Sequence, residues 1–475
     1  MDCGNTVGYH NLGNPEIKMS KRVVILGAGE SGTGAALLAK AKGFDVFVSE
    51  QATIREKYKN ELTREKIAFE EGLHTEALIL NADLVVKSPG VPEKSPIIVQ
   101  VKAAGIDMID EIEFASQYAT GRIIAITGTN GKTTTTLLTY HLMKNAGLNV
   151  ALAGNVGFSM ARQVAQELHD WYVIEVSSFQ LDGMKKFKPE IGVLLNITPD
   201  HLDRYDYKME NYVNSKFRIT DNMDSSQHFI YYLDDPIISA EVNARNPQQK
   251  LVPVSLHGPA GAKCYAIGKR MHFDLGQKFD IDQSETTLKG PHNLINTMSA
   301  VAAVFQAGVP LDAIRAGLKS FKNAPHRLEP VATIKGVDFV NDSKATNVDS
   351  VIYALGSFEK PLVWIAGGVD KGNDYSIIFD QVKQKVRVLI CLGKENGKLK
   401  HYFKGVVPQI FETQNVQELV HIALDAANVG DVILLSPACA SFDLFKNYED
   451  RGNQFRRAVL ELKDEVEGIN ASLNI

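Results

Sequence analysis

The residues of this chain best suited to chemistry form a glycine-rich segment of a type that binds phosphate: Gly128-Thr129-Asn130-Gly131-Lys132-Thr133-Thr134. An apolar run at 123–127 precedes the segment, and a helix-compatible stretch follows it as far as Gly147. A buried strand that turns through glycines into a helix presents backbone N–H groups and the positive end of the helix dipole, and both attract phosphate. Lys132 is then placed to reach the terminal phosphates and Thr133 to ligate Mg²⁺. The segment therefore predicts ATP binding.

This loop is a shortened variant of the common phosphate-binding pattern. The full Walker pattern has a glycine five positions before Gly131, and Ile126 stands there in this chain. The alternative interpretation is a glycine-rich turn with a chance Lys-Thr pair. Strand, loop and helix occur in the required order, which favours ATP.

A second glycine-rich segment, residues 27–32, matches the GxGxxG pattern of dinucleotide-binding proteins. Glu50 ends the next expected strand, near the spacing of a carboxylate that binds ribose. Taken alone, this pattern indicates an NAD-dependent dehydrogenase, which is the competing hypothesis. Because residues 128–134 supply a separate phosphate loop, we favour a diphosphate other than NAD at this position. Glycines that only pack a helix against a strand are the remaining alternative.

Two further motifs place polar side chains at the ends of apolar strands. Glu175 lies in the otherwise apolar run 171–176, and an unpaired buried carboxylate is costly. A magnesium ion shared with ATP phosphates would compensate its charge, and a nearby Lys or Arg is the alternative. His201, in the segment 196–203, is a candidate to ligate a metal or orient a substrate. On spacing alone, Lys216 is expected to be a surface lysine.

The second half of the chain adds polar residues suited to a nucleotide. Asn293 and Asn296 lie about one helical turn apart, which suits contact with a purine edge, although Asn293 is equally suited to cap a helix. Arg327 follows a hinge-like segment at 323–325, where a fixed positive charge can meet phosphate. The cluster 341–347 is too dense in polar and charged side chains to be a plain solvated turn.

Two later loops complete a polar rim suited to a small anionic substrate. Lys371 lies in the glycine-rich segment 367–372, and Ser441 lies in the segment 436–443. A glycine turn and a helix N-cap are the alternatives for these two positions.

Apolar β-branched runs alternate with helix-compatible stretches throughout the chain, and the polar motifs fall just after the apolar runs. This pattern predicts an α/β fold with mostly parallel sheets covered on both faces, whose polar loops gather at the carboxyl ends of the strands. We expect strands at 23–26, 46–48, 83–87, 123–127, 172–176, 191–197, 337–341, 361–366, 387–392 and 432–436. The acidic stretch 110–113 is expected to begin a connector, and the region 220–290 is polar and less regular.

Composition and length bound the class of protein. The 475 residues should form about three domains, and 44% hydrophobic with 23% charged residues is ordinary for a globular protein. A net charge of -5 gives no electrostatic reason to expect nucleic acid or an anionic membrane surface. Four scattered cysteines, without a CxxC pair, indicate reduced thiols in the cytoplasm. Residues 1–18 lack a secretory signal pattern, and we expect them to be a disordered extension or a start-site artefact ahead of Met19.

Together these motifs resemble the Mur ligase family, in order from about Val23 to the C-terminus. The motifs that carry the resemblance are 127–134, 175–180, 196–203, His292-Asn293, 341–347 and 436–443. The phosphate loop is shared with folylpolyglutamate synthases, whereas the last two motifs are similar to those of the members that add D-glutamate. In some members the segment after the second strand reads Asp-Thr-Arg, and here it reads Glu50-Gln51-Ala52. Tyr448 stands where other members can carry Phe.

The resemblance implies a Rossmann-like domain at 19–111 that binds a UDP-substrate, a central P-loop ATPase-like domain at 112–323 and a C-terminal Rossmann-like domain at 324–475 that binds the amino acid. It implies ATP-dependent addition of D-glutamate to UDP-N-acetylmuramoyl-L-alanine through an acyl phosphate, a cytoplasmic step of peptidoglycan precursor synthesis. Another Mur-type or folylpolyglutamate-type amide ligase is the alternative, and a P-loop switch without ligase chemistry is a third class. We expect a monomer that binds small molecules, no nucleic acid and no membrane.

The same resemblance assigns roles residue by residue. Catalysis is assigned to Lys132, Glu175, His201 and Lys216. Further ATP contacts are assigned to residues 128–134, Asn293, Asn296, Arg327 and Asp342. Two Mg²⁺ ions would be held by Thr133, Glu175, His201 and a Lys216 carbamylated by CO₂. The UDP-substrate is assigned to Ser31, Glu50, Ser88, Pro89, Gly90 and Asn155. D-Glutamate is assigned to Lys344, Thr346, Lys371, Ser441, Phe442 and Tyr448.

Overall fold

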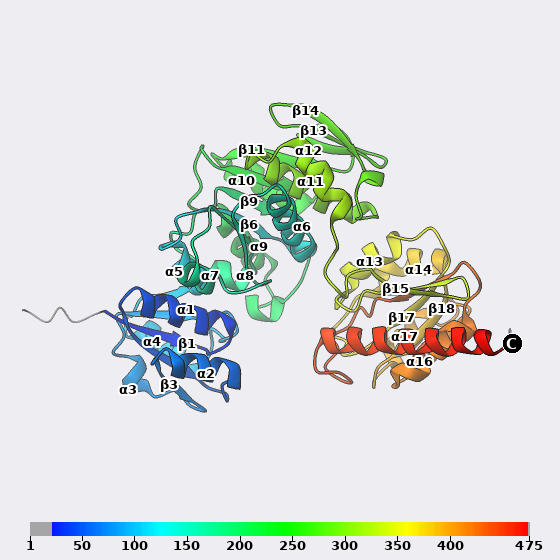
Figure 1. Ribbon diagram of the computed structural model, residues 1–475, viewed down its shortest axis with the longest axis horizontal. Helices are drawn as coiled ribbons and strands as arrows, with labels where there is room; N and C mark the ends of the chain where they lie inside the picture. The colour runs from blue at the N-terminus through cyan, green and yellow to red at the C-terminus, as the bar shows by residue number, and fades with distance from the viewer. Residues whose placement is uncertain (1–20, 474–475) are drawn as a thin grey trace, which may run out of the picture. The chain divides into compact units, whose positions relative to one another are not determined.

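The computed structural model describes residues 21–473, so the expectation for residues 1–18 lies outside the described part of the chain. Internal contacts divide the chain into two compact units (Figure 1). The first unit runs to Tyr118 and includes two later segments, Ser159–Glu167 and Gly183–Lys185. The second unit contains the rest of the described chain and holds two separate sheets.

The first unit is built on a five-stranded parallel sheet in the order β3-β2-β1-β4-β5. Its strands are β1 Arg22–Leu26, β2 Asp45–Glu50, β3 Ala68–Glu71, β4 Leu84–Lys87 and β5 Met108–Asp110. Its helices are α1 Glu30–Ala41, α2 Glu56–Arg64, α3 Glu76–Ile79, α4 Pro96–Ala103, α5 Glu111–Ser116 and α7 Met160–Gln166. The strand order reverses between β1 and β4, which is where open parallel sheets bind ligands.

The nine-stranded sheet of the second unit runs β14-β13-β12-β11-β10-β9-β6-β8-β7, and its neighbouring strands are parallel except in the pairs β12–β13 and β13–β14. Its strands are β6 Arg122–Thr127, β7 Val150–Gly154, β8 Trp171–Glu175, β9 Ile191–Leu194, β10 His228–Tyr232, β11 Lys250–Ser255, β12 Cys264–Ile267, β13 Arg270–Asp274 and β14 Lys278–Asp282. The associated helices are α6 Lys132–Asn145, α8 Ser178–Asp182, α9 Met209–Phe217, α10 Pro236–Arg245, α11 Pro291–Gln306 and α12 Leu311–Ser320. Central strands β6, β8 and β9 are almost entirely buried, which explains their continuous apolar runs.

The six-stranded sheet of the second unit runs β15-β16-β20-β17-β18-β19, with only β15 antiparallel. Its strands are β15 Glu329–Ile334, β16 Val337–Asn341, β17 Leu362–Ala366, β18 Val386–Leu392, β19 Gln409–Thr413 and β20 Val432–Leu435. The helices are α13 Val348–Gly356, α14 Phe379–Lys385, α15 Gly397–Phe403, α16 Val416–Ala426 and α17 Tyr448–Leu473. Figure 1 shows the long helix α17 lying along this sheet beside α16.

The predicted fold class is confirmed, since three sheets of mostly parallel strands alternate with helices. Two local expectations were wrong. The acidic stretch 110–113 is no connector, because Asp110 caps α5 by accepting the N–H of Ile112 at 2.8 Å and Ile112 and Phe114 are buried. The region 220–290 holds five strands, β10 to β14. The domain boundaries at 111/112 and 323/324 stay predictions.

One buried cation joins three loops of the six-stranded sheet. The Arg451 side chain, only 1% exposed, donates to the hydroxyl and carbonyl oxygens of Ser343 at 3.0 and 2.9 Å. It also donates to the carbonyls of Cys439 at 3.2 Å and Gly367 at 3.4 Å. These acceptors follow β16, β20 and β17, so a single guanidinium fixes the three loops that carry most of the residues predicted to bind D-glutamate.

Replacing Arg451 by Ala should destabilise this domain by about 2–4 kcal/mol, because it leaves buried carbonyls unpaired and opens a cavity. The denaturation midpoint reported by Trp364 fluorescence, in a Trp171→Phe background, measures the change. Arg457→Ala, on the exposed face of the same helix, should change the free energy of unfolding by no more than about 0.5 kcal/mol. Equal midpoints for the two variants would contradict the role given to Arg451.

Candidate active site

The phosphate loop connects β6 to α6, as predicted. Gly131 has φ 83°, and a Cβ there would lie 2.4 Å from the amide oxygen of Asn296, so only glycine fits. The backbone of Asn130 is held at two points by the Asn196 side chain, with its N–H donating at 2.8 Å and its carbonyl accepting at 3.0 Å. The loop therefore ends in a fixed turn directly at the start of α6, where helix N–H groups are free to bind an anion.

Two lysine side chains converge on one carbonyl oxygen of this loop. The ammonium groups of Lys132 and Lys216 each donate to the carbonyl of Gly128 at 2.9 Å, so the two nitrogens lie within roughly 6 Å of each other. Lys132 also donates to Thr129 O at 2.7 Å, and Lys216 donates to the Thr127 hydroxyl at 3.2 Å.

Lys216 is 1% exposed, so the expectation of a surface lysine was wrong. It lies on the face of α9 turned to the sheet, which a single lysine among polar residues does not reveal. Burial, and then the charge of Lys132, lower the pKa of Lys216 well below its usual range. Burial also lowers the pKa of Lys132, against the attraction of Glu175 and Asp200. The attraction of the nearby carboxylates therefore does not outweigh the burial of these two amines.

Glu175 ends β8 and is 2% exposed. Its Oε1 accepts from the side-chain amide of Asn155 at 2.7 Å, while its Oε2 is buried without a hydrogen-bond partner. A buried carboxylate oxygen left open fits a cation ligand. The Lys or Arg partner considered from the sequence does not contact this carboxylate within the described residues. Asn155, one of the residues assigned to the UDP-substrate, therefore contacts Glu175 within the second unit.

His201 follows β9 with φ 52°, and its ring packs against Phe179 at 5.3 Å between centroids. Burial lowers the pKa of His201, opposed by Asp200 and reinforced by the charges of Lys132 and Lys371. The imidazole is therefore neutral near pH 7, as a metal ligand must be. Across the described residues there is no preformed group of three or more His, Cys, Asp or Glu side chains, so a metal at this place would need phosphate, hydroxyl or other ligands as well. Thr133 and Glu175 offer suitable oxygens.

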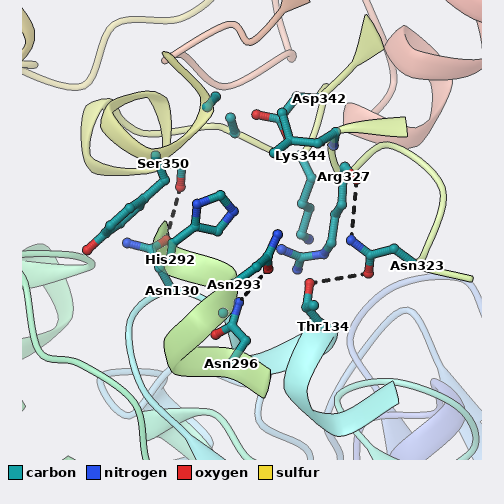
Figure 2. A pocket seen from close by; sticks show the side chains of 15 residues that line it. Asn130, Thr134, His292, Asn293, Asn296, Asn323, Arg327, Asp342, Lys344 and Ser350 are labelled. Carbon is teal, nitrogen blue, oxygen red and sulfur yellow. Dashed lines mark hydrogen bonds between the residues drawn. The ribbon is translucent and has the colours of Figure 1, made fainter. Parts of the chain in front are cut away.

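A pocket beside the loop gathers residues from α6, α11 and the six-stranded sheet (Figure 2). Asn296 donates to the Asn293 side chain at 3.0 Å, and Asn293 donates to the carbonyl of Lys289 at 2.7 Å. Gly290, not Asn293, occupies the N-cap of α11, so the capping alternative was wrong. The two amides form one linked pair at the edge of the pocket, as contact with a purine would require.

The Arg327 side chain extends into this pocket (Figure 2). It donates to the Thr133 hydroxyl at 2.7 Å. Asp342 lines the same pocket and accepts from Ser436 at 2.9 Å and from the N–H of Leu328 at 3.1 Å. Burial raises the pKa of Asp342 to about 7, although these hydrogen bonds and the charge of Arg327 oppose the shift. The free volume is about 70 Å³, well below that of typical ligand pockets, because Arg327 and Lys344 extend into it.

Of the residues assigned to D-glutamate, Lys344 and Tyr448 are in direct contact, with the ammonium nitrogen 3.7 Å from the ring centroid. Burial lowers the pKa of Lys344 to about 8. The loops of Lys371 and Ser441 lie side by side, since Val369 and Ala440 exchange backbone hydrogen bonds at 2.8 and 3.2 Å. Ser441 is buried, Thr346 is half-buried, and Lys371 and Phe442 are exposed, the latter by 70%. These residues therefore surround one end of the sheet without forming a closed site.

A separate pocket in the first unit has a volume of about 910 Å³. Five of the six residues assigned to the UDP-substrate line it, namely Ser31, Glu50, Ser88, Pro89 and Gly90. Glu50 ties two loops together by accepting from the N–H groups of Ala28 at 2.8 Å and Ala52 at 3.0 Å. The loops come from β1, β2 and β4, so the pocket lies at the carboxyl ends of the strands, beside the point where their order reverses.

Several residues in these places received no role from the sequence. Ser350 donates to the Asn130 side chain at 3.0 Å, and Tyr353 packs against His292 with 5.4 Å between centroids. Thr134 donates to Asn323 at 3.3 Å. Asn323 lies in the hinge-like segment already singled out, whereas Ser350 and Tyr353 sit on an ordinary amphipathic helix. Only the tertiary fold brings them to the loop.

Comparisons with known proteins identify the family. The Mur ligase middle domain model matches residues 126–304, the Mur ligase glutamate ligase domain model matches 326–439, and the MurD N-terminal domain model matches 22–97. A Cytophaga hutchinsonii protein named UDP-N-acetylmuramoylalanine–D-glutamate ligase is 52% identical over 94% of this chain and 100% of its own length. Its counterpart of the same name from Bacteroides thetaiotaomicron is 51% identical over 93% of this chain and 100% of its own.

A pseudomurein peptide ligase type C from Methanothermus fervidus shares the fold, with a TM-score of 0.60 at 20% identity, covering 94% of this chain and 100% of that one. The chain belongs to the Mur ligase family. Within that family it is similar over nearly its whole length to proteins named UDP-N-acetylmuramoylalanine–D-glutamate ligase. Separately, none of the helices among residues 21–473 has the length and apolarity needed to cross a membrane.

The raised pKa of Asp342 predicts a pH dependence of stability. The folded state binds this proton more tightly than the unfolded state, so stability should fall as pH rises from about 4 to about 7. Asp342→Asn removes the titrating group and should reduce this slope by up to about 1 kcal/mol per pH unit. Urea denaturation followed by Trp364 fluorescence at pH 4.5, 5.5, 6.5 and 7.5 measures how the free energy of unfolding depends on pH. Parallel pH profiles for the two proteins would contradict the assignment.

Proposed function

We propose that this chain catalyses ATP-dependent addition of D-glutamate to UDP-N-acetylmuramoyl-L-alanine, in the cytoplasmic synthesis of peptidoglycan precursors. The alanine carboxylate of the substrate attacks the γ-phosphate of ATP, which forms an acyl phosphate and ADP. The amine of D-glutamate then attacks the acyl carbon, and phosphate leaves as the amide forms. The names of the similar proteins support this reaction, and so do the phosphate loop and the pocket of the first unit.

One observation carries the proposal: two lysines meet on the Gly128 carbonyl beside a buried carboxylate with a free oxygen. A carboxylate and a triphosphate repel each other, so their reaction needs dense positive charge in a water-poor place. Lys132 is placed to bind the terminal phosphates at the start of α6. Arg327 donates to the Thr133 hydroxyl at 2.7 Å, next to Lys132. Its positive charge is therefore placed to stabilise the negative charge of the phosphoryl group during transfer.

Magnesium fits the residues present. Thr133, Glu175 and His201 would hold it, and when bound it supplies charge neutralisation of the phosphates. The open Oε2 of Glu175 is the observation that favours this assignment. We propose two ions, as the resemblance implies.

The buried amine of Lys216 is suited to carbamylation. Only an unprotonated amine reacts with CO₂, and burial beside Lys132 favours that form. The nitrogen forms a bond to the carbon of CO₂ and releases a proton, which converts the side chain into a carboxylate. We propose that this group serves as a metal ligand, because it places an anion beside Lys132 where a neutral amine stood.

D-Glutamate is assigned to the loops of the six-stranded sheet. Two cations of these loops are proposed to bind its carboxylates. They are Lys344, which lies over the Tyr448 ring, and Lys371. Because acyl phosphates hydrolyse, these loops should close over the intermediate and exclude water, with 323–325 as the hinge. The direct test is ADP release in the presence of ATP, the UDP-substrate and D-glutamate, with each component omitted in turn. Release that does not require D-glutamate would refute the proposal.

Lys132→Ala should lower kcat by at least about 100-fold, because it removes the charge that meets the terminal phosphates. Binding of the UDP-substrate, measured by calorimetry, should be unchanged. Lys144→Ala, at the exposed end of the same helix, serves as the matched control and should keep full activity. Normal turnover in Lys132→Ala would remove this loop from the mechanism.

Lys216→Ala should be nearly inactive and should regain part of its activity when formate or acetate is added, because a small carboxylate can occupy the place of the carbamate. The control is Lys208→Ala, an exposed lysine just before the same helix, which should behave as the wild type. In parallel, ¹³CO₂ should give a carbamate carbon signal in the wild-type protein that is absent from Lys216→Arg. Absence of both rescue and signal would exclude carbamylation.

A further inference from the structure

The pocket of the first unit has polar groups at increasing distance from its glycine-rich loop. The loop at 27–32 follows β1, Glu50 ends β2, and His74 follows β3. Strands in a sheet lie about 4.8 Å apart, so β3 is roughly 10 Å from β1. A nucleotide whose diphosphate lies at the glycine loop and whose ribose lies at Glu50 therefore brings its base to the end of β3. Leu73 and His74 line the pocket there.

His74 belongs to a hydrogen-bonded group of three side chains. Ser49 and Glu70 are direct partners across β2 and β3, and the Ser49 hydroxyl donates to Glu70 Oε1 at 2.6 Å. The same hydroxyl lies 2.7 Å from Nδ1 of His74. Glu70 Oε1 also accepts the N–H of Thr75 at 2.9 Å. Ser49 is fully buried, so no solvent competes for its hydroxyl.

These contacts determine which ring nitrogen of His74 carries the proton. Burial alone would raise the pKa of Glu70, but the hydrogen bonds from Ser49 and Thr75 outweigh it and lower the pKa, so this carboxylate is ionised and only accepts. The single hydroxyl proton of Ser49 therefore points to Glu70, and Ser49 oxygen accepts from Nδ1–H of His74. Burial lowers the pKa of His74 despite Glu70 and Glu50, so the ring is neutral and Nε2 is an acceptor.

Nε2 lies on the opposite edge of the ring from Nδ1 and has no hydrogen-bond partner in the described part of the chain. We propose that this nitrogen accepts the imide N3–H of uracil and so makes His74 a specificity-determining residue for uridine diphosphate substrates. The inference rests on the proposed function, which requires a UDP-linked substrate in this pocket.

Uracil and cytosine differ at the atom that this nitrogen would meet. Uracil presents a donor at N3, whereas cytosine presents a lone pair, which would face the lone pair of Nε2. The ring cannot easily exchange its proton to suit cytosine, since Ser49 would then have to withdraw its hydrogen from the ionised Glu70 at 2.6 Å. Discrimination thus depends on the Ser49–Glu70 pair as well as on His74.

The test compares UDP, CDP and N3-methyl-UDP as calorimetric ligands of the full chain. Wild type should bind UDP about 10–100-fold more tightly than CDP or N3-methyl-UDP. In His74→Phe the three affinities should agree to within about 3-fold. In Ser49→Ala, which keeps the imidazole but frees its tautomer, the UDP to CDP ratio should fall markedly while N3-methyl-UDP remains disfavoured. His272→Gln, in the second unit, is the control and should keep the wild-type ratios.

A UDP to CDP ratio that stays at the wild-type value in both His74→Phe and Ser49→Ala would overturn this inference. Unfolding curves of each variant establish that it is folded, and Ser49→Ala provides the test if His74→Phe is not. Failure of the proposed function has a different signature: wild-type protein would release no ADP in response to D-glutamate, whatever its nucleotide preference.

Discussion

The site depends on one electrostatic constraint, namely that two lysine side chains share the carbonyl oxygen of Gly128 in a place with little water. Two ammonium groups at that distance repel each other, and a low-dielectric surrounding strengthens the repulsion. The carboxylates of Glu175 and Asp200 attract both lysines, and one oxygen of Glu175 already accepts from Asn155. Since burial still lowers the pKa of both lysines, bound anions would stabilise their charged forms, which is the property expected of a site that binds triphosphate and a substrate carboxylate together.

Parallel strands bring polar loops together in both units. In each sheet the chemically active loops follow the carboxyl ends of central strands, so residues distant in sequence meet at one edge. In the six-stranded sheet, the buried Arg451 side chain joins the loops after β16, β17 and β20 through four hydrogen bonds. The Arg451 guanidinium is buried and its partners are neutral, whereas Lys344 is partly buried and Lys371 is exposed.

Much of the fold could be predicted from the sequence, because buried parallel strands are short apolar runs and their loops carry the polar motifs. The strands around β6, β8, β17 and β20 were predicted for this reason. Strands β12 to β14 were not, since antiparallel strands with one exposed face alternate polar and apolar residues and lack a continuous run. Strands β15 and β19 lie at the two edges of their sheet and are likewise partly exposed, although β19 is parallel.

The candidate site was predicted in part. The phosphate loop, Glu175 and Arg327 follow recognisable strand ends or turns. The burial of Lys216 could not be predicted from the sequence, since the neighbouring residues do not show which face of α9 packs against the sheet. The Asn155 contact with Glu175 and the Ser350 contact with Asn130 depend on pairings between distant segments. Local chemistry can thus be read from sequence, whereas its electrostatic setting requires the fold.

We propose that ATP makes a carboxyl carbon electrophilic, and the fate of one carboxylate oxygen atom distinguishes this use of ATP from others. The terminal alanine carboxylate of the UDP-substrate is labelled with ¹⁸O and turned over with ATP and D-glutamate. We expect each inorganic phosphate released to carry one ¹⁸O atom from that carboxylate and the amide to keep the other. Inorganic phosphate without label, formed at the rate of ADP release, would contradict it.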